Sequence, residues 1–196
     1  MEKRKLRIGV LAVQGAFIEH EQVLKNLGAD VFEIRQLRDL DRPMDGLVLP
    51  GGESTVQGKL LRDLGLFEPL QKKIREGLPV LATCAGLILL AEKLSNDSAT
   101  YFSTLPVTVE RNAYGRQLGS FFVQNDLKHV GNVPMTFIRA PIIDHVSDGV
   151  DVLARVNSPV NGDKIVAVQY KKQLALAFHP ELDLDSKVHQ YFLQMI

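Results

Sequence analysis

The sequence contains no tryptophan and a single cysteine, Cys84, among its 196 residues. One cysteine excludes an internal disulfide and fits a reducing compartment, so we expect a cytoplasmic protein. The 23 basic residues balance the 23 acidic ones, which argues against nucleic acid as the main partner. No apolar run reaches the length of a membrane span, and the five histidines are scattered. We therefore expect no membrane insertion, no metal site and no cofactor.

The order of apolar segments predicts an α/β protein. Strand and helix patterns alternate through the first half, which favours a mostly parallel central sheet with helices on both faces. The second half reads as short additional strands, antiparallel in part. The predicted strands are 7–13, 31–34, 46–49, 80–83, 106–110, 119–124, 134–139, 150–156, 164–170 and 173–178, and the predicted helices are 17–27, 56–64, 67–76, 85–94 and 186–196. Because no linker or repeat interrupts the pattern, we expect a single domain over 1–196.

Cys84 stands between a predicted strand and a predicted helix. An apolar segment ends at Thr83, and Ala85 and Gly86 open a second apolar run. A nucleophile at such a turn projects from the carboxyl end of the sheet, and the helix amino terminus behind it favours the thiolate. A lone cysteine among leucines and valines is also typical of a small core residue. Both interpretations remain open on this segment alone.

His179 and Glu181 follow the apolar segment 174–178, with Pro180 between them. Proline ends the strand and stiffens the turn. A histidine at a strand end can accept a thiol proton, and a carboxylate two residues later can hold its other ring nitrogen. A solvated turn would have the same sequence. Paired with the turn at Cys84, however, the segment favours a catalytic arrangement.

Gly51 and Gly52 follow another predicted strand, 46–49, and a proline. Successive glycines let the backbone approach a ligand closely and direct N–H groups toward it, as an oxyanion hole requires. Ser54 or Thr55 would then cap a helix that begins near Val56. Since strands 46–49, 80–83 and 173–178 all precede these motifs, we expect the motifs to meet at one edge of the sheet.

The motifs together resemble those of the class I, triad-type glutamine amidotransferases. They are Pro-Gly-Gly-Glu-Ser-Thr at 50–55, Ala-Thr-Cys-Ala-Gly at 82–86 and His-Pro-Glu at 179–181. Three further segments, 13–16, 109–117 and 137–141, are similar to those of the glutaminase subunits of pyridoxal 5'-phosphate synthase. The resemblance extends from Ile8 to the final helix.

The resemblance implies glutamine hydrolysis to glutamate and ammonia, with Cys84 as nucleophile, His179 as base and Glu181 as its orienting carboxylate. It implies an oxyanion hole at Gly51, Gly52 and Ala85. The implied L-glutamine-binding residues are Gly52, Glu53, Ser54, Arg111, Ile138 and Arg139. The implied partner is a barrel-shaped synthase subunit, obligatory in a large hetero-oligomer, which condenses a pentose phosphate and a triose phosphate with the ammonia.

Three alternatives remain open at this point. A glutaminase subunit of another pathway, such as histidine biosynthesis, would share the triad, although segments 110–117 and 138–141 argue against it. A cysteine peptidase or related hydrolase would also use a cysteine and a histidine. A non-catalytic binding subunit would usually have lost Cys84, His179 or Glu181, and all three are present.

Overall fold

A computed structural model describes residues 4–114, 119–158 and 162–196 of the chain. Gly115, Arg116 and Gln117 of the segment 109–117 lie outside the described residues, as does Asn161 of the segment Asn161-Gly162-Asp163, whose sequence predicts a turn. The described chain contains one ten-stranded sheet and a separate two-stranded hairpin. The predicted α/β class, with helices on both faces and additional antiparallel strands, is confirmed.

The first half of the large sheet is parallel, in the order β2-β1-β3-β4-β12. Its strands are β1 (Arg7–Leu11), β2 (Asp30–Ile34), β3 (Gly46–Leu49), β4 (Val80–Thr83) and β12 (Gln173–Leu176). Strands β3, β4 and β12 are buried along their whole length. Continuous apolar strands are expected where helices cover both faces of a parallel sheet.

The second half is largely antiparallel. It continues from β12 as β11-β9-β6-β5, and β10 pairs with β11 at the side. These strands are β5 (Ala91–Leu94), β6 (Leu105–Glu110), β9 (Ile142–Val146), β10 (Asp151–Ser158) and β11 (Gly162–Tyr170), and the separate hairpin is β7 (Ser120–Leu127) with β8 (Gly131–Ile138). The strands predicted at 164–170 and 173–178 form a hairpin, because β11 pairs antiparallel with β12 across Lys171 and Lys172.

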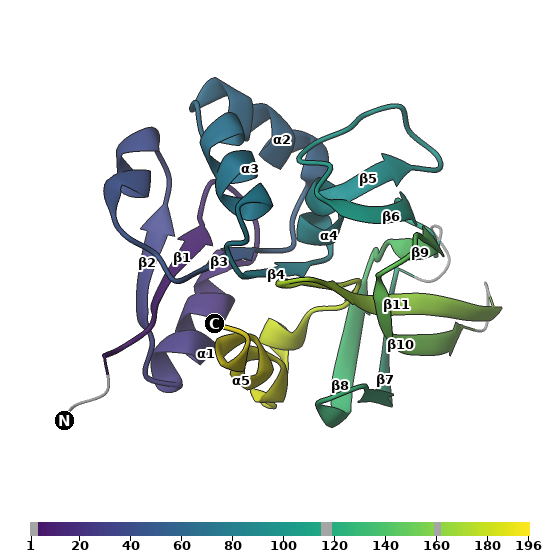
Figure 1. Cartoon of the computed structure of the whole chain (residues 1–196). Helices are drawn as coiled ribbons and strands as arrows, with labels where there is room; N and C mark the ends of the chain where they lie inside the picture. The colour runs from purple at the N-terminus through teal and green to yellow at the C-terminus, as the bar shows by residue number, and fades with distance from the viewer. Residues whose placement is uncertain (1–3, 115–118, 159–161) are drawn as a thin grey trace.

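Helices cover both faces of the parallel half (Figure 1). Helices α1 (Phe17–Asn26) and α5 (Lys187–Gln194) lie on one side, and α2 (Ser54–Asp63), α3 (Phe67–Arg75) and α4 (Ala85–Leu90) on the other. Two short 3-10 helices, η1 (Leu37–Asp41) and η2 (Pro180–Leu182), complete the elements. On this side, α1 also contacts η2, which contains Glu181.

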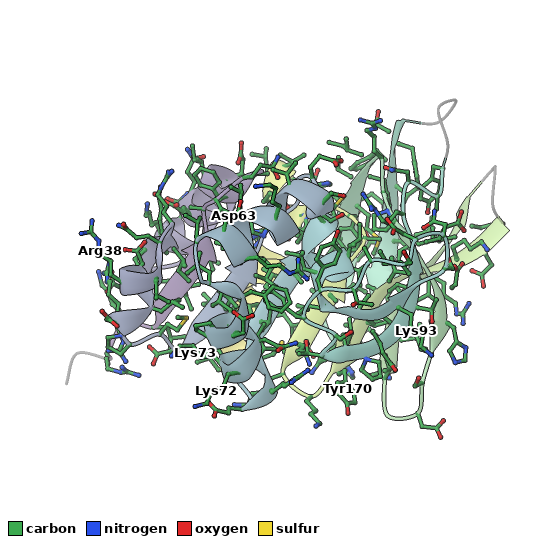
Figure 2. All side chains as sticks on the ribbon, turned by 90° about the horizontal axis from the view of Figure 1, so that it is seen from above. Arg38, Asp63, Lys72, Lys73, Lys93 and Tyr170 are labelled. Carbon is green, nitrogen blue, oxygen red and sulfur yellow. The ribbon has the colours of Figure 1, made fainter. Side chains whose placement is uncertain are left out.

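Charged side chains of both signs cover the outside, for example Arg38, Asp63, Lys72, Lys73 and Lys93 in Figure 2. The interior is one continuous cluster of buried apolar residues that runs from β1 to α5. Within the described parts of the chain, no helix has the length and apolar character needed to cross a membrane.

Two elements differ from the sequence-based prediction. The helix predicted at 85–94 ends at Leu90, and residues 91–94 form β5, which pairs in parallel with β6. Strand β9 was not predicted, although it joins β6 to β11 in the sheet. Both elements depend on partners distant in the sequence, which local periodicity does not report.

The buried side of α1 also differs. An amphipathic helix would pack through its apolar residues Phe17, Val23, Leu24 and Leu27, but the buried residues of α1 are His20, Glu21 and Leu24. Glu21 is compensated by Lys25, whose Nζ lies 2.7 Å from its carboxylate. His20, also buried on α1, needs a hydrogen-bonding partner in the same way, because an unpaired polar group in the core costs free energy.

The start of α2 differs as well. The cap position is Glu53 rather than Ser54 or Thr55, and the Glu53 side chain makes no capping hydrogen bond.

Candidate active site

Three strand ends place the sequence motifs at one edge of the sheet. β3, β4 and β12 are parallel neighbours, with Leu49 paired to Ala82 and Thr83 paired to Leu176. The carboxyl ends of these three strands therefore lie side by side at one edge of the sheet. The carboxyl edge of a parallel sheet is the usual place for a ligand site.

Cys84 occupies a sharp turn between β4 and α4. Its backbone has φ 48° and ψ −102°, a conformation that a non-glycine residue adopts only under local constraint. Its N–H donates to the Leu176 carbonyl at 2.8 Å, and α4 begins at the next residue. A Cβ on Gly86 would lie 2.1 Å from the Leu49 carbonyl oxygen. Only glycine therefore allows α4 to start against β3 and present Cys84 at the sheet edge.

His179 and Glu181 form a buried pair beside this turn. The His179 N–H donates to the Thr136 carbonyl at 2.8 Å, and its ring Nδ1 lies 2.7 Å from Glu181 Oε1. Pro180 opens η2, which brings the Glu181 carboxylate back onto the ring. This geometry fixes the ring orientation and directs the other ring nitrogen away from Glu181.

The electrostatics favour a charged pair. Burial alone would lower the pKa of His179, but hydrogen bonds to Cys84 and Glu181 outweigh it and raise this pKa to about 10. Burial likewise opposes ionisation of Glu181, yet the neighbouring His20 and His179 hold the pKa of its carboxyl below the usual value. Near neutral pH, the His179 ring is therefore protonated on both nitrogens and positively charged, and it lies between Cys84 and the ionised Glu181 carboxylate.

The glycine turn is held against both motifs. The Gly51 N–H donates to Thr83 Oγ1 at 3.1 Å, and the Gly51 carbonyl accepts from the Ala16 N–H at 3.0 Å. Because the peptide is planar and trans, the Gly52 N–H points away from Ala16. Ala85 contributes an N–H of the first helical turn, which has no acceptor within the helix. Since Thr83 already uses the Gly51 N–H, Gly52 and Ala85 are the donors left for a ligand.

A cavity of about 240 Å³ opens in front of Cys84 and His179. It is smaller than a drug-sized pocket of about 300–1,000 Å³, as suits a small substrate. Six residues expected to bind glutamine line it together with Cys84 and His179: Gly52, Glu53, Ser54, Arg111, Ile138 and Arg139. Glu181 lies behind His179 rather than in the wall. The structure thus brings these positions together, while their individual roles stay predictions.

The sequence interpretation missed two residues of the wall, Ile88 and Asn112. Ile88 lies one helical turn after Cys84, and Asn112 follows Arg111, so both positions could have been inferred from spacing. The two arginines differ in their surroundings. Arg111 pairs with Asp97 at 2.7 Å and donates to Thr55 Oγ1 at 3.1 Å, whereas the Arg139 side chain is exposed.

Gly51→Ala should impair the site more than it impairs the fold. A Cβ at Gly51 would lie 2.3 Å from His179 Cε1 and 3.3 Å from Cys84 Cβ. The ring must move, and a displacement of about 1 Å can reduce turnover about 100-fold. Overpacking of this kind costs about 1–3 kcal/mol of stability. Glutamine turnover and thermal unfolding measure the two effects separately.

The control is Gly119→Ala, where the added methyl group meets no atom within 4 Å. It should retain both turnover and stability. Full activity in Gly51→Ala would show that the glycine turn does not approach the catalytic residues as closely as described.

Comparison with solved structures confirms the fold class. A structure titled "Crystal structure of glutamine amidotransferase" superposes with a TM-score of 0.88 and 40% sequence identity, over 96% of this chain and 97% of that one. A structure of PurLQS from Thermotoga maritima gives a TM-score of 0.70 over 97% of this chain and 99% of that one, at 17% identity. The second likeness concerns the fold alone.

Curated relatives carry the same name in distant organisms. Proteins named pyridoxal 5'-phosphate synthase subunit PdxT are 62% identical in Desulfitobacterium hafniense (strain Y51), 56% in Methanocorpusculum labreanum and 51% in Streptococcus pneumoniae. Each alignment covers 97% of this chain and 94%, 98% and 97% of the respective relative. Residues 10–196 match the SNO glutamine amidotransferase family. The resemblance found in the motifs is confirmed, and the chain belongs to the SNO glutamine amidotransferase family.

Proposed function

We propose that this chain is the glutaminase subunit of a pyridoxal 5'-phosphate synthase. The observation that carries the proposal is the convergence of Cys84 and His179 at a cavity of suitable size, with the Glu181 carboxylate bonded to the His179 ring from behind, in a chain of this family. The pathway is inferred from the curated relatives, which are named as subunits of pyridoxal 5'-phosphate synthase. Residues 1–196 form one glutaminase domain in this proposal, which the continuous core supports.

The proposed reaction is hydrolysis of the glutamine side-chain amide. The Cys84 thiolate attacks the carboxamide carbon, and the N–H groups of Gly52 and Ala85 stabilise the oxyanion. Loss of one such donor typically costs about 3 kcal/mol in the barrier. His179 holds the thiol proton and transfers it to the leaving ammonia, while Glu181 keeps the ring in place. Water then cleaves the glutamyl thioester to glutamate.

Substrate recognition is proposed for the wall of the same cavity. Gly52, Glu53 and Ser54 would contact glutamine from the glycine turn, and Ile138 and Arg139 from the opposite wall. A guanidinium can grip a carboxylate in two places, which suits Arg111 or Arg139. Because Arg111 is already paired with Asp97, Arg139 is the better placed of the two for the substrate carboxylate.

A partner follows from the chemistry of the product. Ammonia is mostly protonated near neutral pH and then cannot act as a nucleophile, so it must be passed on before it reaches water. We propose a barrel-shaped synthase subunit as the obligate acceptor, in a large hetero-oligomer. We place the complex in the cytoplasm, which the free Cys84 supports.

The alternatives fare less well. A glutaminase of another pathway lacks support, since relatives at 51–62% identity share one name. For a cysteine peptidase, the cavity of about 240 Å³ leaves little room for a peptide. A purely binding subunit would have no need for a charged His179–Glu181 pair beside a cysteine.

The isolated chain should hydrolyse glutamine poorly, and the synthase subunit should activate it. Gln14 is placed to relay the contact, because its Oε1 accepts from the Glu53 N–H at 2.9 Å and its carbonyl accepts from Gln57. We expect a higher turnover number on addition of the synthase subunit, and loss of this increase in Gln14→Ala. Glutamate release measures both.

The matched control is Gln22→Ala, which removes an exposed glutamine from α1. It should be activated like the wild type. Equal rates with and without the synthase subunit would contradict the proposed activation and favour a stand-alone amidase.

A further inference from the structure

A buried polar cluster lies directly behind the Glu181 carboxylate and is not used by the proposed reaction. It consists of His20 on α1, Thr83 at the end of β4 and His189 on α5. All three side chains are fully buried. His20 lies against the Glu181 carboxylate, and Thr83 and His189 both contact His20. Their contacts show what holds them together.

His20 connects the members of this cluster. Its Nδ1 lies 2.9 Å from His189 Nε2, and its Nε2 lies 3.2 Å from Thr83 Oγ1 and 3.4 Å from Glu181 Oε2. Among the described residues, Glu181 Oε2 has no hydrogen bond of ordinary geometry. His20 Nε2 is thus positioned to supply the donor that this buried carboxylate oxygen requires.

The proton arrangement follows from the charges. Burial lowers the pKa of His20 and lowers that of His189 to about 3, so both rings are neutral near pH 7. An ionised carboxylate accepts hydrogen bonds only, so the single proton of His20 belongs on Nε2. Its Nδ1 then accepts from the Nε2–H of His189. His189 Nδ1 finds no partner in the described structure, which fits an unprotonated nitrogen better than a buried N–H.

Thr83 links the same ring to the glycine turn. Its hydroxyl oxygen contacts His20 Nε2 and also accepts the N–H of Gly51 at 3.1 Å. The His20 ring therefore contacts both the Glu181 carboxylate, which orients His179, and the Thr83 hydroxyl, which holds the glycine turn at Gly51. A displacement of His20 would reach both halves of the active site.

Fold stability alone does not account for such a cluster. Well-packed apolar side chains of similar volume usually stabilise a core as well as buried polar groups, or better. The helices α1 and α5 could pack there through leucines, as α1 does one turn later through the fully buried Leu24. Histidines instead occupy these positions: His20 faces Glu181 and Thr83, and His189 faces His20.

We propose that His20 is a positioning residue of the glutaminase, held in one tautomer by His189 and donating from Nε2 toward Glu181 and Thr83. His20 fixes the Glu181 carboxylate, which orients His179, and couples this carboxylate to the glycine turn. The proposal rests on the proposed glutaminase function for its effect on turnover, but its structural part is independent of turnover.

The test compares His20→Gln with His20→Asn in the complex with the synthase subunit. A glutamine amide reaches the place of the ring Nε2, whereas an asparagine amide reaches only that of Nδ1. We expect kcat for glutamine to fall about 10- to 100-fold in His20→Asn, the range seen when an orienting partner is lost. His20→Gln should recover most of it. KM should change less than kcat in both variants.

Two further measurements separate positioning from general damage. Leu24→Ala removes a fully buried side chain from the same helix, and should lower the melting temperature while leaving kcat unchanged. The proton NMR resonance of His179 Nδ1–H, which bridges to Glu181, should shift in His20→Asn but not in Leu24→Ala. This resonance is informative even if the wild-type complex fails to hydrolyse glutamine, an outcome that would refute the proposed function alone.

Equal kcat values for His20→Gln and His20→Asn would overturn the proposal. So would a loss of kcat in Leu24→Ala equal to that in His20→Asn, or an unchanged His179 resonance in His20→Asn. If His20→Asn does not fold, a kcat in His20→Gln that falls about 10- to 100-fold while the His179 resonance keeps its wild-type position would also contradict it.

Discussion

Cys84→Ser should reduce glutamine hydrolysis by about 10⁴-fold or more while the fold stays intact. The substitution is nearly isosteric, so the turn between β4 and α4 should keep its φ of 48°. A hydroxyl is far less ionised than a thiol beside a histidine, which removes the attacking group. Glutamate release from the complex with the synthase subunit measures the loss, and circular dichroism checks the fold.

Covalent labelling gives an independent check of the same residue. The chain contains one cysteine, so a glutamine-analogue electrophile should add a single label, located at Cys84 by peptide mass spectrometry. The Cys84→Ser variant should take up none. Substantial turnover in this variant with glutamine bound, or a label at another residue, would contradict the assignment of the nucleophile.

His179→Ala should lower turnover more than Glu181→Ala does. A positioned general acid–base group contributes about 10²–10⁴-fold to the rate, and in the proposed reaction His179 transfers the proton itself. In the proposed reaction Glu181 only orients the ring through its 2.7 Å hydrogen bond, and without Glu181 the imidazole should still sample useful orientations. Steady-state kcat of the two variants in the synthase complex provides the comparison.

A titration of His179 distinguishes the two roles further. Glu181 helps to raise the pKa of His179 to about 10, against the opposing effect of burial. In Glu181→Gln this charge is lost, so His179 should release its proton at a lower pH than in the wild type. Following the ring resonances by NMR measures this directly. Full activity of Glu181→Ala would reduce Glu181 to a residue of the turn.

The parallel half of the fold could be predicted from the sequence because its strands are short apolar runs that end in glycine, proline or a polar residue. β3 and β4 match their predicted bounds. The region 91–94 could not be assigned locally, since Ala91-Glu92-Lys93-Leu94 directly continues the chain of α4 and only its pairing with β6 makes it a strand. β9 was not predicted for a related reason: it is defined by its pairing with β6 and β11, and both strands are distant from it in the sequence.

The motifs around Cys84, Gly51 and His179 could be brought together from sequence because each follows a strand of one parallel sheet. His20, Thr83 and His189 could not, since they are separated by 63 and 106 positions and occupy faces that look like ordinary helix or strand surfaces. Only the packing of α1 and α5 against the strand end shows that they meet. Polar residues in a core become interpretable only when their partners are known.

Whether the chain supplies ammonia for pyridoxal 5'-phosphate synthesis can be measured by following the amide nitrogen of glutamine into the product. The chain and its synthase subunit are supplied with glutamine labelled with ¹⁵N in the side-chain amide, together with the pentose and triose phosphates, and the product is examined by mass spectrometry. We expect ¹⁵N in pyridoxal 5'-phosphate, its loss in Cys84→Ser, and its restoration in that variant by ¹⁵N-ammonium. Unlabelled product, or labelled product from Cys84→Ser with glutamine as the nitrogen source, would contradict the proposed function.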